Sequence, residues 1–174
     1  KKLEEESGSN WRSNLTKVAA DPNRSVADRR RAVGILQQFS DGPPRRLLTS
    51  LANDDKPQMR ALALTLLAIH IDDEAEKIIV QALGDSDPVV RRRACEALIR
   101  ANKTAPVEVV LPMLAEQDRF ARYAARELLQ RLPAEQWADA VLTADDPRIA
   151  AAGMLALVIN SPTAEQNEAI LKRS

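Results

Sequence analysis

A fixed period of 31 residues constrains this 174-residue chain more than any other feature of its sequence. Four segments that superpose without a gap begin at Ser25, Lys56, Asp87 and Asp118, so each start follows the last by 31 (56 − 25, 87 − 56, 118 − 87). A period of roughly 20 to 50 residues made of helical units is typical of a solenoid, in which each unit buries its apolar face only against its neighbours. The chain is therefore predicted to be a scaffold built from repeated helix pairs.

Two apolar faces keep this period. In the inner helix of each unit, apolar residues recur at offsets +3, +7, +10 and +11 from the unit start, which is the spacing of one face of an α-helix. In the third unit these positions hold Val90, Ala94, Ala97 and Leu98. In the outer helix, equivalent positions hold Leu47, Ile78 and Val109. Because two separate faces share one period, the sequence predicts an all-α stack of antiparallel helix pairs.

A fifth unit follows a shorter step of 28 residues, from Asp118 to Asp146. The predicted units cover residues 11–40, 43–71, 72–103, 105–132 and 133–160, with a partial sixth unit at 163–174. Residues 1–10 lack apolar periodicity and are expected to form a disordered lead-in to a repeat domain over 11–174. The inner helix predicted at 149–159 is apolar almost all round and must be covered. We therefore expect a piece of a longer protein, the alternative being that the last helix caps the stack.

Prolines mark the predicted helix starts. Those of outer helices are Pro44, Pro106, Pro133 and Pro162, and those of inner helices are Pro57, Pro88 and Pro147. The first turn tolerates proline because the missing N–H has no partner there in any case. Pro112 is different, since it falls inside the fourth outer helix and is expected to bend it.

Composition narrows the classes of function. The chain has 25 basic and 25 acidic side chains, so its net charge gives no support to nucleic-acid binding. Cys95 is the one cysteine, which excludes an internal disulfide and any cysteine-based zinc site. No run of about 18 apolar residues is present, so no membrane interaction is expected. The first ten residues are charged and polar, unlike a signal peptide, and the compartment stays open.

No residue pattern predicts catalysis, a metal site or a cofactor. The five glycines form no phosphate-binding motif, and His70, the only histidine, has no second ligand at i+4. The carboxylate clusters open predicted helices, where capping is the main interpretation and a calcium or catalytic role the alternative. Cys95 follows three arginines that would make its thiol reactive, but a small, semi-buried residue is the preferred interpretation. No small-molecule substrate is predicted.

The string over residues 83–98, LGDSDPVVRRRACEAL, resembles a HEAT repeat of the short type also found in phycobilisome-lyase-like proteins. The resemblance covers about residues 11–160 and implies a right-handed α-solenoid of about five stacked antiparallel helix pairs. In that family, an Asp in the turn between paired helices and an Arg six residues later build a ladder that links successive units. The matching pairs here are Asp54 with Arg60, Asp85 with Arg91 and, conservatively, Glu116 with Arg122. Asn23 with Arg29 is a weaker match, and Ala144 with Ala150 has lost the ladder.

The same resemblance implies that the inner helices line a concave surface. A mixed basic and aromatic strip would lie there, made of Arg30, Arg31, Arg92, Arg93, Tyr123 and Arg126, with Glu96 and Glu127 one turn on. Arginine and tyrosine dominate the energy of interfaces when they are desolvated, which favours a protein partner. The glutamates can equally pair with these arginines on an ordinary solvated face. Three interpretations stay open: a solvated face, a protein-binding strip and, least favoured, a nucleic-acid strip.

The leading functional hypothesis is a non-catalytic scaffold or protein–protein interaction module that binds a partner, or flanking domains of the same polypeptide, through the concave face. The alternative is a structural spacer within a larger enzyme, which the apolar inner helix predicted at 149–159 favours. Residues 118–158 also resemble repeats of large multidomain bacterial proteins, some joined to haem or dehydrogenase modules. A lesser alternative is a HEAT-like enzyme such as a bilin lyase or a DNA glycosylase. A glycosylase would expose an aromatic residue and an acid on a basic rim, whereas Trp137 is predicted in the core, equivalent to Val109.

Overall fold

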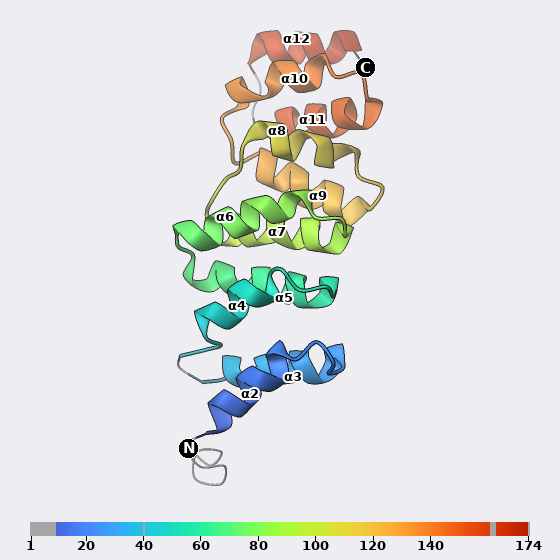
Figure 1. Ribbon diagram of the computed structural model, residues 1–174. Helices are drawn as coiled ribbons and strands as arrows, with labels where there is room; N and C mark the ends of the chain where they lie inside the picture. Colours follow the sequence, from blue (N-terminus) through green and yellow to red (C-terminus); the bar gives the residue numbers. More distant parts are fainter. Residues whose placement is uncertain (1–9, 40, 161–162, 174) are drawn as a thin grey trace. The chain divides into compact units, whose positions relative to one another are not determined.

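The computed structural model describes residues 10–39, 41–160 and 163–173, and the regular secondary structure in these ranges is all helical (Figure 1). The chain divides into two compact units, Lys1–Leu67 and Ala68–Ser174. The predicted lead-in falls, apart from Asn10, outside the described residues, as does Pro162. The all-α fold class predicted from the repeat is confirmed.

The first unit consists of two helix pairs. Helix α2 (Trp11–Ala20) packs on α3 (Val26–Gln37), and α4 (Arg45–Leu51) packs on α5 (Pro57–Leu67). The outer helices α2 and α4 also contact each other, as do the inner helices α3 and α5. The unit is therefore built of an outer and an inner layer, with apolar side chains between them.

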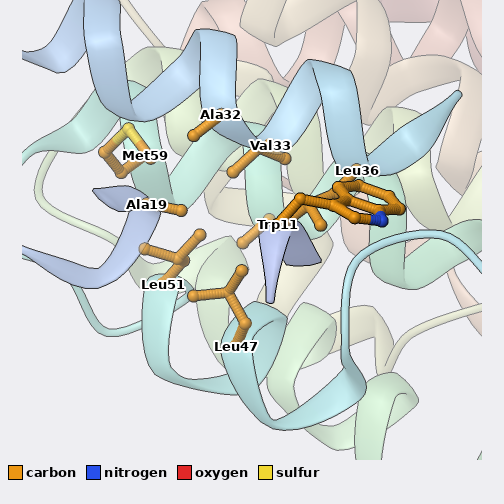
Figure 2. Close-up of a cluster of buried hydrophobic side chains, with 9 residues drawn as sticks. Trp11, Ala19, Ala32, Val33, Leu36, Leu47, Leu51 and Met59 are labelled. Carbon is orange, nitrogen blue, oxygen red and sulfur yellow. The ribbon is translucent and has the colours of Figure 1, made fainter. Parts of the chain in front are cut away.

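Aliphatic side chains and one tryptophan form the core of the first unit (Figure 2). The buried cluster consists of Trp11, Ala19, Ala32, Val33, Leu36, Leu47, Leu51, Met59 and Ala63. The ring of Trp11 packs against that of Phe39, with 4.3 Å between the centroids. Burying a side chain of the size of Leu36 stabilises a fold by about 1.5–3 kcal/mol. Burial at the contacts between helices therefore contributes a large part of the stability of this unit.

The second unit repeats the same two layers. In chain order its elements are η1 (Ala68–His70), α6 (Asp73–Gln81), η2 (Ala82–Gly84), α7 (Pro88–Arg100), α8 (Val107–Val110), η3 (Leu111–Ala115), α9 (Arg119–Leu129), η4 (Ala134–Gln136), α10 (Ala138–Leu142), α11 (Pro147–Ile159) and α12 (Ala164–Arg173), where η marks a 3-10 helix. The inner helix α9 packs between α7 and α11, and the outer helices α6, α8 and α10 each pack on the inner helix that follows them (Figure 1). Helix α12 continues the outer layer by packing on α10.

The inner helices begin with the period found in the sequence. Helices α3, α5, α7 and α9 begin at residues 26, 57, 88 and 119, in steps of 31 (57 − 26, 88 − 57, 119 − 88), and α11 begins 28 residues after α9 (147 − 119). In α7, the predicted core residues Val90, Ala94, Ala97 and Leu98 are all buried. The predicted apolar face of this inner helix is thus confirmed.

Aspartates cap four helices of the second unit. The capping residues are Asp72 for α6, Asp87 for α7, Asp118 for α9 and Asp146 for α11. Each carboxylate accepts a hydrogen bond from a backbone N–H of the first turn, at 2.7 to 2.9 Å. A negative charge at this end also interacts favourably with the helix dipole. Capping, the preferred interpretation of the acidic clusters, is confirmed for Asp72, Asp87 and Asp146, and Asp118 caps α9 in the same way.

Two details of the outer layer differ from the prediction. Pro112 does not bend one continuous helix: α8 ends at Val110 and the chain continues as the 3-10 helix η3. Proline has no N–H to donate and its ring crowds the preceding turn, which interrupts an α-helix. Trp137 is fully buried as expected, but it stands at the junction of η4 and α10 rather than within a helix. Its indole N–H donates to the Leu132 carbonyl at 3.2 Å.

Helices α10 and α11 approach each other closely at Gly153. A Cβ atom at this position would collide with the side chain of Val141, well inside van der Waals contact. Only a glycine therefore allows the observed spacing of the two helices, and it does so by lacking a side chain.

Candidate functional site

A groove of about 400 Å³ lies between the inner helices α7 and α9 of the second unit. Helix α7 contributes Arg92, Glu96, Ile99 and Arg100 to its lining. Helix α9 contributes Phe120, Tyr123, Ala124 and Glu127. The side chains on each helix recur at spacings of three or four residues, so each set belongs to one helix face. The groove is therefore a feature of the repeat: it forms where two adjacent inner helices turn matching faces outward.

Two aromatic rings in the groove are half exposed. Phe120 is 50% and Tyr123 56% exposed, although the chain has few aromatic residues to place on a surface. The guanidinium carbons of Arg92 and Arg119 lie 5.7 and 4.6 Å from the centre of the Phe120 ring. That of Arg126 lies 5.0 Å from the centre of the Tyr123 ring. Such cation–π contacts hold each ring beside a positive charge while leaving much of the ring accessible.

Glutamates within the same face bind some of these arginines. Glu96 forms ion pairs with Arg92, at 3.3 Å, and with Arg93. Glu127 lies 3.5 Å from Arg126. Exposed pairs of this kind contribute little to stability, typically about 0–1 kcal/mol. Their effect is to orient the arginine side chains across the face.

The structure separates the predicted strip into three groups. Arg92, Glu96, Tyr123 and Glu127 line the groove. Arg93 and Arg126 stand at its side, where they contact Glu96 and Tyr123 respectively. Arg30 and Arg31 are exposed on α3, which belongs to the first unit.

Four groove residues were not part of the strip predicted from the sequence: Ile99, Arg100, Phe120 and Ala124. Ile99 and Arg100 lie at offsets +12 and +13 from Asp87, which continues the line of Arg92 at +5 and Glu96 at +9. Helical spacing could therefore have assigned Ile99 and Arg100 to the same face, although the prediction included only Arg92 and Glu96 from this row. Phe120 occupies the first turn of α9, where an exposed aromatic residue has no explanation in core packing.

The ladder arginines join successive turns of the repeat. Nη1 of Arg91 donates to the Asp85 carbonyl at 2.6 Å, in the turn before its own helix. Its Nε and Nη2 donate to the Glu116 carboxylate at 2.5 and 2.6 Å, in the next turn. In the first unit, the buried Arg29 donates to the Ala19 carbonyl at 2.9 Å and binds both oxygens of the Asp54 carboxylate.

The observed ladder differs from the predicted one, in which each arginine pairs with the acidic side chain six residues earlier. Arg60 and Arg122 also contact the residue six positions earlier, but through its main-chain carbonyl, at 2.8 Å from Asp54 and 2.6 Å from Glu116. The carboxylate that Arg29 or Arg91 binds comes from 25 residues later. Asn23 therefore need not be acidic, because Arg29 takes its carboxylate from Asp54.

Asp54 has a pKa below its ordinary value. Burial of the carboxyl raises the pKa, but this effect is outweighed by hydrogen bonds from Arg29 and from the backbone N–H of Lys56, with the charges of Arg29 and Arg60, which lower it. Asp54 is therefore ionised when the unit is folded at neutral pH, and the nearly inaccessible Arg29 has a counter-ion.

Cys95 is a core residue. Its side chain is fully buried, and Sγ lies 3.9 Å from Sδ of Met113. Burial, with the negative charges of Glu96 and Glu116, raises the pKa of the thiol to about 12. The neighbouring arginines do not activate it, because they point to acidic partners and to the surface. The interpretation as a small packed residue therefore holds over that of a reactive thiol.

The described residues offer no metal-binding cluster: nowhere among them do three His, Cys, Asp or Glu side chains gather as ligands. Among the described helices, none has both the length and the apolar character that a membrane span requires.

Stacked helix pairs, a fixed period and a ladder between turns define a helical-repeat protein of the α-solenoid class. A family model for HEAT repeats matches residues 44–130, half of the chain, and this range includes both helices of the groove. The chain belongs to the HEAT-repeat family, as its sequence suggested. Members of this family generally mediate protein–protein interaction or scaffolding and are typically non-catalytic. No curated protein and no solved structure matched the chain.

Proposed function

We propose that the chain is a non-catalytic protein-binding module and that the groove between α7 and α9 is its binding site. The observation that carries this proposal is the pair of half-exposed rings, Phe120 and Tyr123, which line the groove beside arginines. Exposed aromatic residues grouped with arginine are the residue types that contribute most to interfaces when a partner desolvates them. The family supports the same class of function, since HEAT repeats generally bind proteins.

The geometry favours binding without a large loss of conformational freedom. Each ring is held by a guanidinium group, and each groove glutamate is held by an arginine of its own helix. A partner that docks here meets side chains already ordered on two rigid helices, so fewer rotamers are lost on binding. The groove is also open to solvent and does not close into a chamber that would exclude water, which suits a binding surface better than a catalytic site.

A structural spacer within a larger enzyme is the second candidate. It is favoured by Leu155, Val158 and Ile159 on α11, which are 46, 54 and 53% exposed and which a neighbouring domain would cover. The glycosylase alternative is disfavoured by Trp137, because this tryptophan is fully buried and cannot stack on a flipped base.

Affinity capture from a lysate of the source organism separates the two candidates. The chain would be immobilised beside a Phe120→Ala, Tyr123→Ala variant and beside a Leu171→Ala control. Leu171 is 77% exposed on the outer helix α12 and does not line the groove, so it controls for the loss of an exposed apolar side chain. A binding module predicts that the double variant loses a specific partner that the chain and the control both retain, with unchanged thermal melts. Equal capture by all three proteins, or none, would instead support the spacer.

A further inference from the structure

The exposed face of α11 continues the face that forms the groove. Measured from Asp146, residues Ala151, Leu155, Val158 and Ile159 stand at offsets +5, +9, +12 and +13. These are the offsets of the groove residues Arg92, Glu96, Ile99 and Arg100 from Asp87. Equal offsets in equivalent helices of a repeat place side chains on the same face of the layer. The stripe on α11 is therefore the next row of one surface.

These rows are contiguous within the second unit. Helix α9 packs against α7 on one side and α11 on the other, so the three helices form one inner layer (Figure 1). Along this layer the chemistry changes from arginine and aromatic side chains on α7 and α9 to aliphatic side chains on α11. Leu155, Val158 and Ile159 lie three or four residues apart along one helix face, and each is about half exposed. This makes a continuous apolar stripe along α11, beyond the groove.

The α7 and α9 rows carry an excess of positive charge. Apart from the ladder residues Arg91 and Arg122, these two helices contain five arginines and two glutamates, although the whole chain is neutral. Arg100 and Arg119 are exposed, and the ion pairs formed by α7 and α9 among the described residues involve neither of them. Charge is therefore segregated onto this face and is only partly neutralised by its own glutamates.

We propose that the face formed by α7, α9 and α11 binds an amphipathic helix with acidic residues near one end and large aliphatic residues near the other. This inference rests on the proposed function and names the chemistry of its partner. Acidic side chains of the partner pair with Arg100 and Arg119, and its aliphatic side chains cover Leu155, Val158 and Ile159. The described residues offer no strand edge with which a peptide backbone could pair, which favours a partner that satisfies its own backbone hydrogen bonds, as a helix does.

Two other occupants fit the observations less well. Nucleic acid would gain from the arginines, but the aliphatic stripe on α11 would stay uncovered. A second copy of the chain, docked through the same face, would bring the same positive charge against itself. An acidic amphipathic helix meets both halves of the surface at once.

Selection from a display library of random peptides of roughly 18 residues tests this inference, since a length of this order gives a helix of about 27 Å. The chain is the bait, and selected peptides are measured by fluorescence anisotropy against four variants of similar thermal stability. One variant changes the stripe (Leu155→Ser, Val158→Ser), one changes the charge (Arg100→Glu, Arg119→Glu), and one removes the rings (Phe120→Ala, Tyr123→Ala). The control is Leu171→Ser, which changes an exposed residue of the outer helix α12. A duplex DNA of random sequence and sedimentation of the chain alone cover the other two occupants.

The inference predicts enriched peptides with aspartate or glutamate and with leucine or phenylalanine at i, i+3 and i+4 spacing. Their affinity falls by about tenfold or more in the stripe and charge variants but not in the control, and it falls with added salt. Enrichment of basic peptides, tight salt-sensitive binding of DNA, or self-association lost in the stripe variant would overturn it. If peptides depend on Phe120 and Tyr123 but not on α11 or on the two arginines, the proposed function stands and this inference fails. If no peptide binds, this inference fails, whereas the proposed function is decided by the affinity capture.

Discussion

Arg29 and Arg91 each bind a main-chain carbonyl near their own helix and a carboxylate from the next turn. The side chain of Arg91 is 17% exposed and that of its partner Glu116 is 16% exposed, so the pair is largely removed from water. Arg93, two residues away, pairs with Glu96 while 42% exposed. The two arginines therefore offer a matched comparison between a structural and a surface ion pair in one helix.

Replacing Arg91 should destabilise the chain more than replacing Arg93. Arg91→Met leaves the Glu116 carboxylate and the Asp85 carbonyl without their donor, which costs about 1–3 kcal/mol for partly buried polar groups. Arg93→Met removes a surface pair and should cost less than about 1 kcal/mol. Urea denaturation of both variants measures the difference. Equal losses would show that the ladder does not stabilise the unit.

The pair of Arg29 and Asp54 predicts a loss of stability in acid. Asp54 has a lower pKa in the folded chain than in the unfolded chain, so folding favours its ionised form. The stabilisation is complete above the unfolded pKa of about 4 and is lost as the pH falls through the folded pKa. Thermal melts between about pH 2 and pH 6 should show a steeper acid loss for the chain than for Asp54→Asn, which lacks the titrating group. Parallel curves for the two proteins would rule out this contribution.

At the scale of the element, α11 packs closely on α10 because Gly153 has no side chain at the point of contact. The Gly153 position has no room for a Cβ atom beside Val141, whereas a Cβ atom at Gly34 in the inner helix α3 would meet nothing within 4 Å. The two glycines therefore have the same helix propensity, but only Gly153 stands where a side chain would clash.

Alanine at these two glycines should have opposite effects. Gly153→Ala forces α10 and α11 apart or displaces Val141, and overpacking of this kind costs about 1–3 kcal/mol. Gly34→Ala meets nothing and should stabilise α3 by about 0.5–1 kcal/mol, because glycine is the more flexible residue in the unfolded chain. The melting temperatures of the two variants check both signs. A stabilising Gly153→Ala would mean that α10 and α11 are not tightly packed.

The 31-residue period predicted the helices well because it arises from the apolar face that every helix of the repeat must bury. It predicted the starts of the inner helices and the buried face of α7, but it did not predict that Pro112 ends α8. A proline within a helix pattern permits either a bend or a break, and packing around it decides. The period also did not identify the carboxylate partners of Arg29 and Arg91. These lie 25 residues away, and a six-residue spacing only shows that two residues share a turn.

The candidate site was partly predictable for a related reason. Arg92, Glu96, Tyr123 and Glu127 could be assigned to one face from helical spacing alone. Phe120 could not, because its exposure depends on how the first turn of α9 sits beside α7. Local periodicity gives the face of a helix, while the shape of a groove depends on two helices at once.

At the scale of the whole molecule, the chain has two compact units, each with its own core. Leu36 is fully buried in the first unit, and Leu98 is fully buried in the second, where Cys95 also lies. Cys95 has a thiol pKa of about 12 and no access to solvent, so its alkylation requires unfolding of the second unit.

Protection of Cys95 should therefore depend on one unit only. Leu98→Ala should cost about 2–5 kcal/mol and shift the urea concentration at which iodoacetamide labels Cys95. Leu36→Ala should lower the stability of the first unit by a similar amount and leave that labelling midpoint unchanged. Labelling followed by mass spectrometry, with circular dichroism as a measure of total helix, distinguishes the two. Equal shifts in both variants would show that the chain unfolds as one cooperative block.

The ladder gives the repeats a direction that matters for engineering. A repeat with an arginine at the start of its inner helix needs an acidic residue in the repeat that follows, as Arg91 needs Glu116. After Arg122 that position holds Ala144, which has no carboxylate to offer. A repeat copied and inserted behind Arg122 would therefore have to carry an acid in its turn, and a cassette placed in the opposite order would not join. Each repeat of the ladder thus offers an arginine to the repeat that follows it and an acidic residue to the repeat before it, and any rearrangement of the repeats must keep this order.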